Sequence, residues 1–362
     1  MVNKPRPIGS TLGILGGGQL GRMVSLAAAR LGYKTHVYDA IKGSPGMQVS
    51  DRSTVADFFN TDALEKFSLS CDVVTYEFEN IPLSAAEKIA SSVPLIPSVM
   101  ALAISQDRFK EKEFLFNNNI SVAPYFLVRN MRELEEGFKK IGFPSVLKSR
   151  TMGYDGKGQN TFKSKKEIYS YNFENSSQES VLESWVNYDC EISVTIVRDS
   201  TGRSVSYDVS ENQHKNHVLD KTIVPARIST ELSDKAKKIA KKIAVLLNLE
   251  GTLTVEMFVV NQDIIVNEIA PRPHNSAHWT IDAARVSQFE QLVRVAMNLP
   301  LGSTDRMYDA TMKNLLGKEI NSWASYIRKP KNIIHIYGKS KIKDGRKMGH
   351  VTSLRSKSSF FQ

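Results

Sequence analysis

Residues 11–39 combine a short apolar strand, a glycine turn and an amphipathic helix that leads into a second strand, and this order restricts the fold more than any other feature. Further apolar strands are predicted at 71–79 and 93–97. Strands that alternate with helices predict a parallel sheet with helices on its faces. The first strand is 11–16, the second is 34–39, and the helix between them keeps apolar side chains at helical spacing at Leu20, Met23, Val24, Ala27, Ala28 and Leu31.

After Pro97 the pattern changes, and two further regions follow. A chain of 362 residues has room for two or three domains, which agrees with this division, and no internal repeat is visible. The middle region has predicted helices at 101–118, 131–141 and 165–172 and strands at 145–150, 159–163 and 179–186. The last region has predicted strands at 190–199, 251–260 and 263–269 and helices at 232–248 and 286–298.

The composition excludes several classes of protein. No apolar run approaches the roughly 20 residues that a membrane-spanning helix needs, and we expect no signal peptide because glycines interrupt the first apolar stretch. Cys71 and Cys190 are the only cysteines, so we expect no disulfide framework and a reducing, cytoplasmic setting. The net charge of +10 comes from basic residues scattered along helices such as 234–249. This pattern favours attraction of small anions over nucleic-acid binding.

The glycine turn fits more than one ligand. Gly16, Gly18 and Gly21 match the G-x-G-x-x-G spacing of dinucleotide-binding turns, and Asp39 ends the next strand, close to the roughly 20-residue spacing of a ribose ligand. On this motif alone a nicotinamide-dependent dehydrogenase, another phosphate ligand and a tight turn without a ligand all stay open. The later motifs argue against the dehydrogenase, because they indicate a nucleoside triphosphate and a metal.

Two glutamates on a predicted hairpin indicate a magnesium site. Strands on either side of a three-residue loop at 261–263 place Glu256 opposite Glu268. Like charges directly opposite each other destabilise a ladder unless a cation lies between them, and Mg²⁺ takes carboxylate and phosphate oxygens together. Asn267 adds a neutral ligand only if a bulge turns its side chain to the same face. The apolar residues around both glutamates argue against a solvated pair.

Two loops have the composition of anion sites. Pro271 and Pro273 restrain the first loop, which displays Arg272, His274 and Asn275 beside the predicted metal site.

The second loop, SRTMGYDGKGQ at 149–159, follows a strand that carries Lys148 and has glycines at 153, 156 and 158. It lacks the P-loop spacing, and its aspartate–glycine pair also occurs in plain hairpin turns. Its glycines and lysine favour phosphate, because glycine lets backbone N–H groups approach phosphate oxygens.

These motifs together resemble the ATP-grasp superfamily, and within it the N5-carboxyaminoimidazole ribonucleotide synthetases. The resemblance implies an α/β fold with α+β character in its ATP-grasp part. It implies a Rossmann-like parallel-sheet domain at 1–104, a mobile lid at 105–187 and a C-terminal domain with a mixed or antiparallel sheet at 188–362, with ATP between the last two. The matching stretches span residues 13–350 and are GILGGGQLGRM, TYEFENIP, SQDRFKEK, GYDGKGQ, TIVPARI, NEIAPRPHNSAHWT, VSQFE and HIYGKSKIKDGRKMGH.

The resemblance also implies a reaction, in which ATP, bicarbonate and 5-aminoimidazole ribonucleotide give ADP, phosphate and the N5-carboxylated product through carboxyphosphate, in purine biosynthesis. For ATP it implies phosphate contacts from Arg108 and Lys148, a ribose contact from Glu191 and a further contact from His214. Glu256 and Glu268 are the implied Mg²⁺ ligands, with Asn267 beside them and Mn²⁺ as a substitute ion. The implied lid loop is Gly153, Tyr154, Asp155, Gly156, Lys157, Gly158 and Gln159, and the implied adenine-binding hinge is Glu183, Ser184, Trp185 and Val186.

For the ribonucleotide the resemblance implies contacts at the first helix, at the ribose and at a 5′-phosphate clamp. Glu77 is preferred to Glu79 as the ribose ligand. Arg272 and His274 are expected to hold bicarbonate, and either His274 or Asp155 to move the amine proton. The other implied contacts are Gln19, Leu20, Asn275, the clamp Lys339, Arg346 and Lys347, and Tyr154 and Asp155 from the lid.

One position departs from the family pattern, and several alternatives stay open. Met152 stands where relatives often carry a glycine, which puts the rate of lid closure in doubt. A formate-dependent glycinamide ribonucleotide transformylase is the runner-up, since it would share the ATP site and the clamp. A dehydrogenase and a non-catalytic nucleotide-binding module are the alternatives from other classes. The resemblance implies a homodimer and a downstream mutase as partners, and neither nucleic acid nor a membrane is expected.

Overall fold

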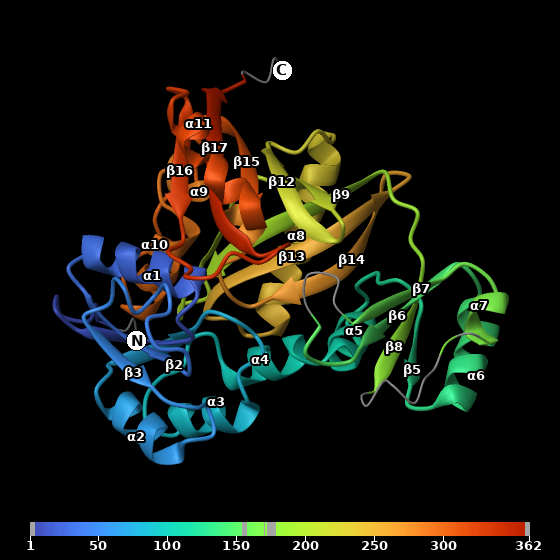
Figure 1. Cartoon of the computed structure of the whole chain (residues 1–362), viewed down its shortest axis with the longest axis horizontal. Helices are drawn as coiled ribbons and strands as arrows, with labels where there is room; N and C mark the ends of the chain where they lie inside the picture. Colours follow the sequence, from blue (N-terminus) through green and yellow to red (C-terminus); the bar gives the residue numbers. More distant parts are fainter. Residues whose placement is uncertain (1–3, 154–157, 170, 172–178, 359–362) are drawn as a thin grey trace.

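The computed structural model describes residues 4–153, 158–169, 171 and 179–358. Over these ranges the strands form three sheets, and each sheet has its own helices (Figure 1). No helix within the described ranges is long and apolar enough to cross a bilayer.

The N-terminal sheet is parallel, as the alternation of strands and helices predicts. Gly13 in its first strand permits close packing, because a Cβ atom there would lie 2.8 Å from both Cys71 Sγ and Val74 Cγ2. The segment 93–97 was wrongly predicted as a strand: it forms one parallel bridge, Leu95 to Val74, since its two prolines lack the N–H that a ladder needs. The strand order is β3 (Arg52–Val55), β2 (Lys34–Asp39), β1 (Thr11–Leu15) and β4 (Val73–Tyr76), with helices α1 (Gln19–Arg30), α2 (Thr61–Leu69) and α3 (Leu83–Ala90).

The sheet of the central region is antiparallel and has its own core (Figure 1, green). That core includes Leu134, Leu147 and Leu182 and is separate from the other core clusters of the described chain. A separate core is what a lid needs if it is to move as one unit. The strand order is β5 (Tyr125–Val128), β8 (Ser180–Ser184), β6 (Ser145–Ser149) and β7 (Gln159–Phe162), with helices α6 (Met131–Ile141) and α7 (Lys166–Tyr169).

The C-terminal sheet is antiparallel and is covered by α8 (Thr230–Leu246). Helix α5 (Arg108–Asn117) joins the same core through Leu115, although residue 105 was the predicted start of the lid. The lid strands begin only at β5, and the exact domain boundaries stay a prediction. The strand order is β14 (Asp263–Ala270), β13 (Gly251–Val260), β9 (Cys190–Arg198), β11 (Ser210–Lys215), β12 (Val218–Val224), β15 (Tyr308–Leu316), β17 (Lys347–Ser356) and β16 (Asn332–Ile336), with β10 (Ser204–Ser206) paired to β9. The remaining helices are α4 (Val99–Ser105), α9 (Thr280–Ala283), α10 (Gln288–Ala296) and α11 (Trp323–Ile327).

The N-terminal and C-terminal parts share one core, which fixes them against each other. Helix α1 packs on α10, and Val24 lies in the same buried cluster as Phe289 and Tyr337. Polar contacts add to this: Gln48 Nε2 donates to the carbonyl of Gly338 at 2.8 Å. The parallel sheet and the end of the C-terminal sheet are thus one block, against which the lid is the separate part (Figure 1).

Candidate active site

The β13–β14 hairpin brings Glu256 and Glu268 opposite each other, as predicted, but by a different route. The turn has two residues, Asn261 and Gln262, both at positive φ (47° and 69°), so the predicted three-residue loop was wrong. A bulge compensates for the missing residue: Met257 pairs with Val266, whereas Glu256 pairs with Glu268. The bulge that the prediction required for Asn267 is therefore present.

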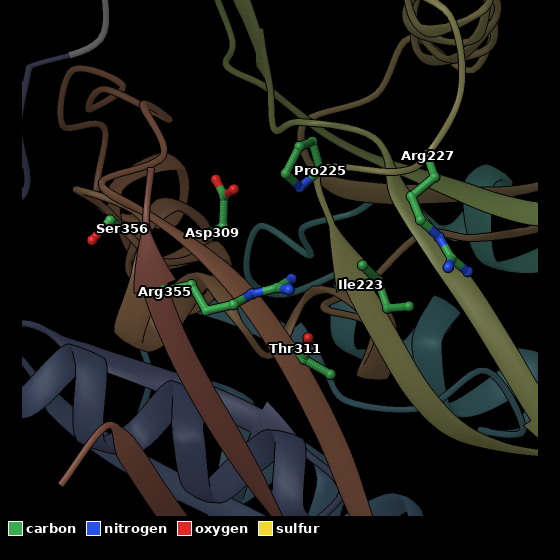
Figure 2. A pocket seen from close by; sticks show the side chains of 7 residues that line it. All are labelled: Ile223, Pro225, Arg227, Asp309, Thr311, Arg355 and Ser356. Carbon is green, nitrogen blue, oxygen red and sulfur yellow. The ribbon is translucent and has the colours of Figure 1, made fainter. Parts of the chain in front are cut away.

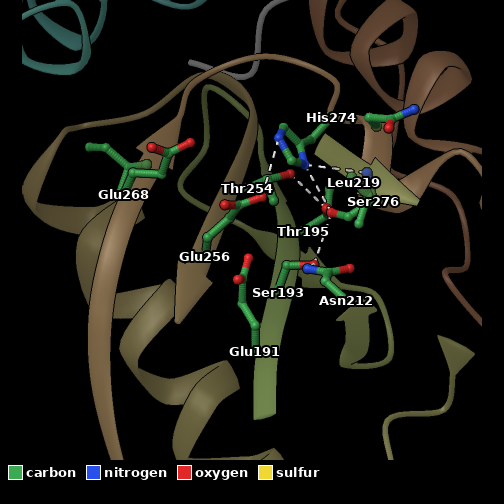
Figure 3. Close-up of polar contacts among 12 residues, drawn as sticks. Glu191, Ser193, Thr195, Asn212, Leu219, Thr254, Glu256, Glu268, His274 and Ser276 are labelled. Atoms are coloured by element: carbon green, nitrogen blue, oxygen red, sulfur yellow. Dashed lines mark hydrogen bonds and ion pairs between the residues drawn. The ribbon is translucent and has the colours of Figure 1, made fainter. Parts of the chain in front are cut away.

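Three carboxylates lie near one another here: Glu256 and Glu268 on the hairpin, and Glu191 on the neighbouring strand β9 (Figure 3). Burial, together with the charges of Glu191 and Glu268, raises the pKa of Glu256 well above its ordinary value. Burial and the charge of Glu268 likewise raise the pKa of Glu191 to about 8. Asn267 Oδ1 is buried and accepts no hydrogen bond from the described residues. Clustered carboxylates next to an unpartnered amide oxygen fit a hard divalent cation such as Mg²⁺.

Helix α5 supplies the next layer of the site from one of its faces. Arg108, Glu111 and Lys112 are three and four residues apart, so their side chains lie together. Lys112 has no exposed side-chain area, and its Nζ donates to the carbonyl of Asn267 at 2.8 Å. Sequence reasoning missed Lys112. Its four-residue spacing from Arg108 within the matching stretch SQDRFKEK was the signal that could have found it.

Glu183, at the end of lid strand β8, is surrounded by three cations. Its Oε2 lies 3.1 Å from Lys148 Nζ and 3.3 Å from Lys112 Nζ, and its Oε1 lies 3.9 Å from Arg108 Nη1. Burial raises the pKa of Glu183, but the charges of Lys112, Lys148 and Arg108 outweigh burial and lower this pKa to about 2. Burial lowers the pKa of Lys148, and one carboxylate does not offset it. This excess of positive charge is suited to a polyphosphate anion.

The predicted nucleoside contacts lie on two neighbouring elements. Glu191 on β9 and His214 on β11 come together, with Glu191 Oε2 3.3 Å from His214 Nδ1. In the predicted hinge, Ser184 N–H donates to the carbonyl of Pro124 at 2.9 Å and Trp185 N–H to the carbonyl of Pro144 at 3.0 Å. Those two N–H groups are thus used within the central sheet, and the predicted contact of residues 183–186 with adenine stays a prediction.

The glycine loop between β6 and β7 is described only at its ends. Tyr154, Asp155, Gly156 and Lys157 lie outside the described residues, so their predicted roles stay predictions. Gly158 has a φ of +72°, and a Cβ atom there would lie 2.2 Å from Ser149 Oγ, which explains the glycine. At the other end, between β6 and Gly153, Met152 has a φ of 62°. A glycine would adopt this conformation without strain, whereas a methionine does so rarely.

The base of the loop is anchored to α5, a contact that sequence reasoning missed. Arg150 donates to both carboxylate oxygens of Asp107, at 2.8 and 2.7 Å. Asp107 in turn caps α5 by accepting from Lys110 N–H at 3.2 Å. Gln159, on the far side of the loop, begins β7 and pairs with Lys148.

The proline-restrained loop lies beside the carboxylates, as predicted from the sequence. Arg272 pairs with Glu79 at 2.6 Å, and His274 Nε2 lies 3.5 Å from Glu256 Oε1. Burial and the charges of Arg272 and Lys347 lower the pKa of His274 well below its ordinary value. Asn275 is buried and exchanges two hydrogen bonds with Asn314, of 3.0 and 2.6 Å.

Two carboxylates accept hydrogen bonds from the backbone of the glycine turn in the N-terminal domain. Glu77 accepts from the N–H groups of Gly18 and Gly21, and Asp39 accepts from Gly17 N–H at 2.8 Å. The Asp39 carboxylate is therefore bonded within the turn itself. The main argument for a dinucleotide ligand, in which Asp39 binds a ribose, no longer holds. Gln19 and Leu20 open α1 directly after this turn, and Glu77 keeps its ribose role only as a prediction.

The predicted phosphate clamp lies between β16 and β17. Lys339 Nζ donates to the carbonyl of Lys347 at 2.7 Å, and Arg346 Nη1 donates to the carbonyl of Lys341 at 2.9 Å. Burial raises the pKa of both Glu77 and Glu256, and the charge of Lys339 partly offsets the rise at Glu77, as the charge of Lys347 does at Glu256. The clamp thus lies within electrostatic reach of both the glycine turn and the carboxylates.

Two other features of the C-terminal sheet do not belong to this site. Figure 2 shows a hollow on β12, β15 and β17 that none of the predicted site residues lines, and Arg227 at its edge is bonded to Glu211. Asp282, His335 and His350 lie close enough to suggest a metal site. However, the rings of His335 and His350 are stacked at 4.5 Å with 18° between their planes, so their in-plane lone pairs do not converge on one ion.

Family comparisons cover almost the whole chain. The ribonucleotide synthetase preATP-grasp domain matches residues 10–106, the ATP-grasp domain matches 113–289, and the phosphoribosylaminoimidazole carboxylase C-terminal domain matches 310–359. The N5-carboxyaminoimidazole ribonucleotide synthase of Brucella melitensis biotype 1 is 42% identical over 350 residues, covering 96% of this chain and 97% of the relative.

Solved structures agree with these matches. The ADP complex of an N5-carboxyaminoimidazole ribonucleotide synthetase superposes with a TM-score of 0.94 at 42% identity, covering 98% of this chain and 94% of that one. An N5-carboxyaminoimidazole synthase from Aspergillus clavatus, in complex with ADP and 5-aminoimidazole ribonucleotide, superposes with a TM-score of 0.91 at 30% identity, covering 96% of this chain and 94% of that one.

Proposed function

This chain belongs to the N5-carboxyaminoimidazole ribonucleotide synthases of the ATP-grasp superfamily, and from that premise we propose how its own residues divide the work of the reaction. The enzyme is a ligase that carboxylates 5-aminoimidazole ribonucleotide with the use of ATP in purine biosynthesis. The assignment of roles rests on Glu183. This carboxylate of the lid sheet lies among the cations Arg108, Lys112 and Lys148, next to the carboxylate hairpin.

ATP lies between the lid and the C-terminal sheet, with its phosphates against Arg108 and Lys148. The excess positive charge around Glu183 supports this placement, because a triphosphate compensates it. Glu191 and His214 take the ribose side, and the hinge 183–186 takes adenine. The glycine loop closes over the β- and γ-phosphates and excludes water, which would hydrolyse a reactive intermediate.

Glu256 and Glu268 hold Mg²⁺, with Asn267 as a neutral neighbour, and Mn²⁺ is the expected substitute. The clustered carboxylates and the unpartnered Asn267 Oδ1 support this assignment. When bound, the ion neutralises charge on the triphosphate oxygens. Lys112 acts behind the site, because its hydrogen bond to the carbonyl of Asn267 fixes the bulge that presents both Asn267 and Glu268.

Bicarbonate is held by Arg272 and His274 beside the carboxylate hairpin. Its oxygen attacks the γ-phosphorus and ADP leaves, which gives carboxyphosphate. The exocyclic amine of the ribonucleotide then attacks the carbon of carboxyphosphate, phosphate leaves, and a base takes the amine proton. Arg108 and Lys148 offset the charge that develops on the transferred phosphoryl group.

The ribonucleotide lies between the N-terminal domain and the clamp. Gln19 and Leu20 at the start of α1, together with Glu77 and Asn275, line its nucleoside side, and Lys339, Arg346 and Lys347 take the 5′-phosphate. Support comes from the shared core, which fixes α1 relative to the C-terminal sheet, and from the action of the Lys339 charge on Glu77.

Lys339→Met is expected to raise the KM for 5-aminoimidazole ribonucleotide roughly 10- to 100-fold and to leave the KM for ATP unchanged, because a charged hydrogen bond to phosphate is lost. Steady-state ADP release with each substrate varied in turn measures both constants. Lys341→Met is the matched control, since Lys341 is an exposed lysine of the same turn, and it should behave as wild type. An equal loss in both variants would contradict the clamp.

We propose a homodimer in the cytoplasm as the working form, with the mutase that consumes the product as its functional partner. Both described cysteines are free thiols, which supports a reducing compartment.

The decisive experiment is ADP release with ATP, Mg²⁺ and bicarbonate, with and without 5-aminoimidazole ribonucleotide. We expect strong stimulation by the ribonucleotide and loss of ADP release when the ion is chelated. Stimulation by glycinamide ribonucleotide and formate instead would point to the transformylase. No ATP hydrolysis under any of these conditions would overturn the assignment of the ATP site.

A further inference from the structure

We propose that Ser276 is a positioning residue that fixes His274 with its proton on Nε2, so that His274 can donate a hydrogen bond into the bicarbonate site but cannot accept the amine proton. The proposal rests on the proposed role of His274 in holding bicarbonate. It is carried by a chain of buried hydrogen bonds that runs from β12 through β11 and β9 to the proline-restrained loop (Figure 3).

Each hydroxyl has a single proton, so these hydrogen bonds all run one way or all run the other, and the backbone N–H of Ser276 at His274 Nδ1 selects the direction described next. Thr222 Oγ1 donates to Asn212 Oδ1 at 3.2 Å, which fixes the orientation of that amide. Asn212 Nδ2 then donates to Ser193 Oγ at 3.0 Å, and Ser193 Oγ donates to Ser276 Oγ at 2.8 Å. Ser276 Oγ already accepts this bond, so its own proton is directed to His274 Nδ1, 2.9 Å away.

A second donor reaches the same ring nitrogen. The backbone N–H of Ser276 donates to His274 Nδ1 at 3.3 Å. A backbone N–H cannot act as an acceptor, so Nδ1 must present its lone pair. Both donors of Ser276 therefore require that His274 carries its proton on Nε2.

The chain is shielded from water, which keeps it in this arrangement. Thr222 and Ser276 have no exposed area, and Ser193 and Asn212 are exposed by only 2% and 5%. Reversing these hydrogen bonds would turn the Asn212 amide, leave the proton of the buried Thr222 hydroxyl without its acceptor, and place a proton on His274 Nδ1 against the Ser276 N–H. The direction of the chain is therefore set by the sheet and not by the substrate.

The consequence lies at the other ring nitrogen. Nε2–H points to the carboxylate side of the site, 3.5 Å from Glu256 Oε1. A group in this state can stabilise an oxygen of bicarbonate or of carboxyphosphate by donating to it. It has no lone pair to offer there, so of the two residues considered for the amine proton, His274 is excluded.

The test is the ring-nitrogen spectrum of the free enzyme labelled with ¹⁵N-histidine. The protein has seven histidines, and the signals of His274 are identified by their absence in His274→Gln. We expect a pyridine-like Nδ1 and a pyrrole-like Nε2. A pyrrole-like Nδ1 would overturn the proposal, and this result needs neither substrate nor a second variant.

A pair of variants tests the role of Ser276. Ser276→Ala is expected to shift the His274 signals toward a mixture of tautomers and to lower kcat about tenfold, with the KM for ATP unchanged. Thr195→Val is the matched control, because it removes a buried hydroxyl that pairs with Thr254 at 2.7 Å outside the chain. It should leave the tautomer unchanged. An unchanged His274 spectrum in Ser276→Ala would count against the proposal.

The spectrum and the assay of ADP release separate this proposal from the proposed function. The other tautomer in an enzyme that the ribonucleotide still stimulates overturns the role of Ser276 alone. The expected tautomer in an enzyme without that activity overturns the proposed function alone.

Discussion

Glu268→Gln is expected to lower kcat/KM for ATP about a thousandfold at saturating Mg²⁺, because the variant loses a negatively charged ligand of the proposed Mg²⁺ ion. A loss of about 4 kcal/mol in the transition state corresponds to that factor. Glu268 is the most exposed of the three carboxylates at the hairpin, with 40% of its side chain accessible compared with 8% for Glu191 and 10% for Glu256. Its carboxylate is therefore the most accessible of the three to an ion that enters from solvent.

The measurement is ADP release over a titration of Mg²⁺. Asp263→Asn is the matched control: it removes a carboxylate of the same hairpin whose side chain is 80% exposed, and it should behave as wild type. Near-normal hydrolysis by Glu268→Gln at saturating Mg²⁺ would remove Glu268 from the metal site.

The second large effect is expected on stability. Glu183→Gln should destabilise the enzyme by about 3–5 kcal/mol, because it leaves the buried cations Lys112, Lys148 and Arg108 without their shared carboxylate. Urea unfolding followed by tryptophan fluorescence measures the loss as a lower midpoint. Glu136→Gln in α6 is the control, since it breaks an exposed pair with Arg132 and should cost at most about 0.5 kcal/mol. Equal midpoints for the two variants would refute the role of Glu183.

The same carboxylate predicts a pH dependence. The pKa of Glu183 is lowered in the folded protein to about 2, whereas the unfolded chain has a pKa of about 4.3. A lowered pKa contributes stability that is present above the unfolded value and is lost as pH falls through the folded value. The difference in stability between wild type and Glu183→Gln should therefore be largest near neutral pH and shrink between about pH 4.3 and 2. A difference that stays constant over this range would show that the ionisation of Glu183 does not cause it.

Local patterns in the sequence predicted many of the helices and strands, because each of these elements depends mainly on residues that are near one another in the sequence. The strand, glycine turn and helix at 11–31 follow from apolar spacing alone, and so do the two long strands of the carboxylate hairpin. The facing pair Glu256 and Glu268 was predicted from a loop length that was wrong, and the result held because a bulge at Asn267 shifts the register by the same one residue. Turn type and bulges depend on contacts across strands, which periodicity does not report.

Partners that are distant in sequence were the part that could not be predicted. Lys112 meets Glu183 and Asn267 only because three elements converge, and Asp107 meets Arg150 for the same reason. The resemblance supplied roles for Glu77 and Asn275, but packing gives both of them structural partners, the N–H groups of the glycine turn and the Asn314 amide. Such partners require the tertiary structure.

The shared core of α1 and α10 has a consequence for synthesis on the ribosome. Arg30 ends α1 and Gln288 begins α10, so 258 residues must be added before the face of α1 that packs on α10 is covered. At roughly 5–20 residues per second, a nascent chain exposes that face for about 13 to 52 seconds. Chains released before α10 is made keep the face uncovered, so we expect truncated products to aggregate or to be retained by chaperones.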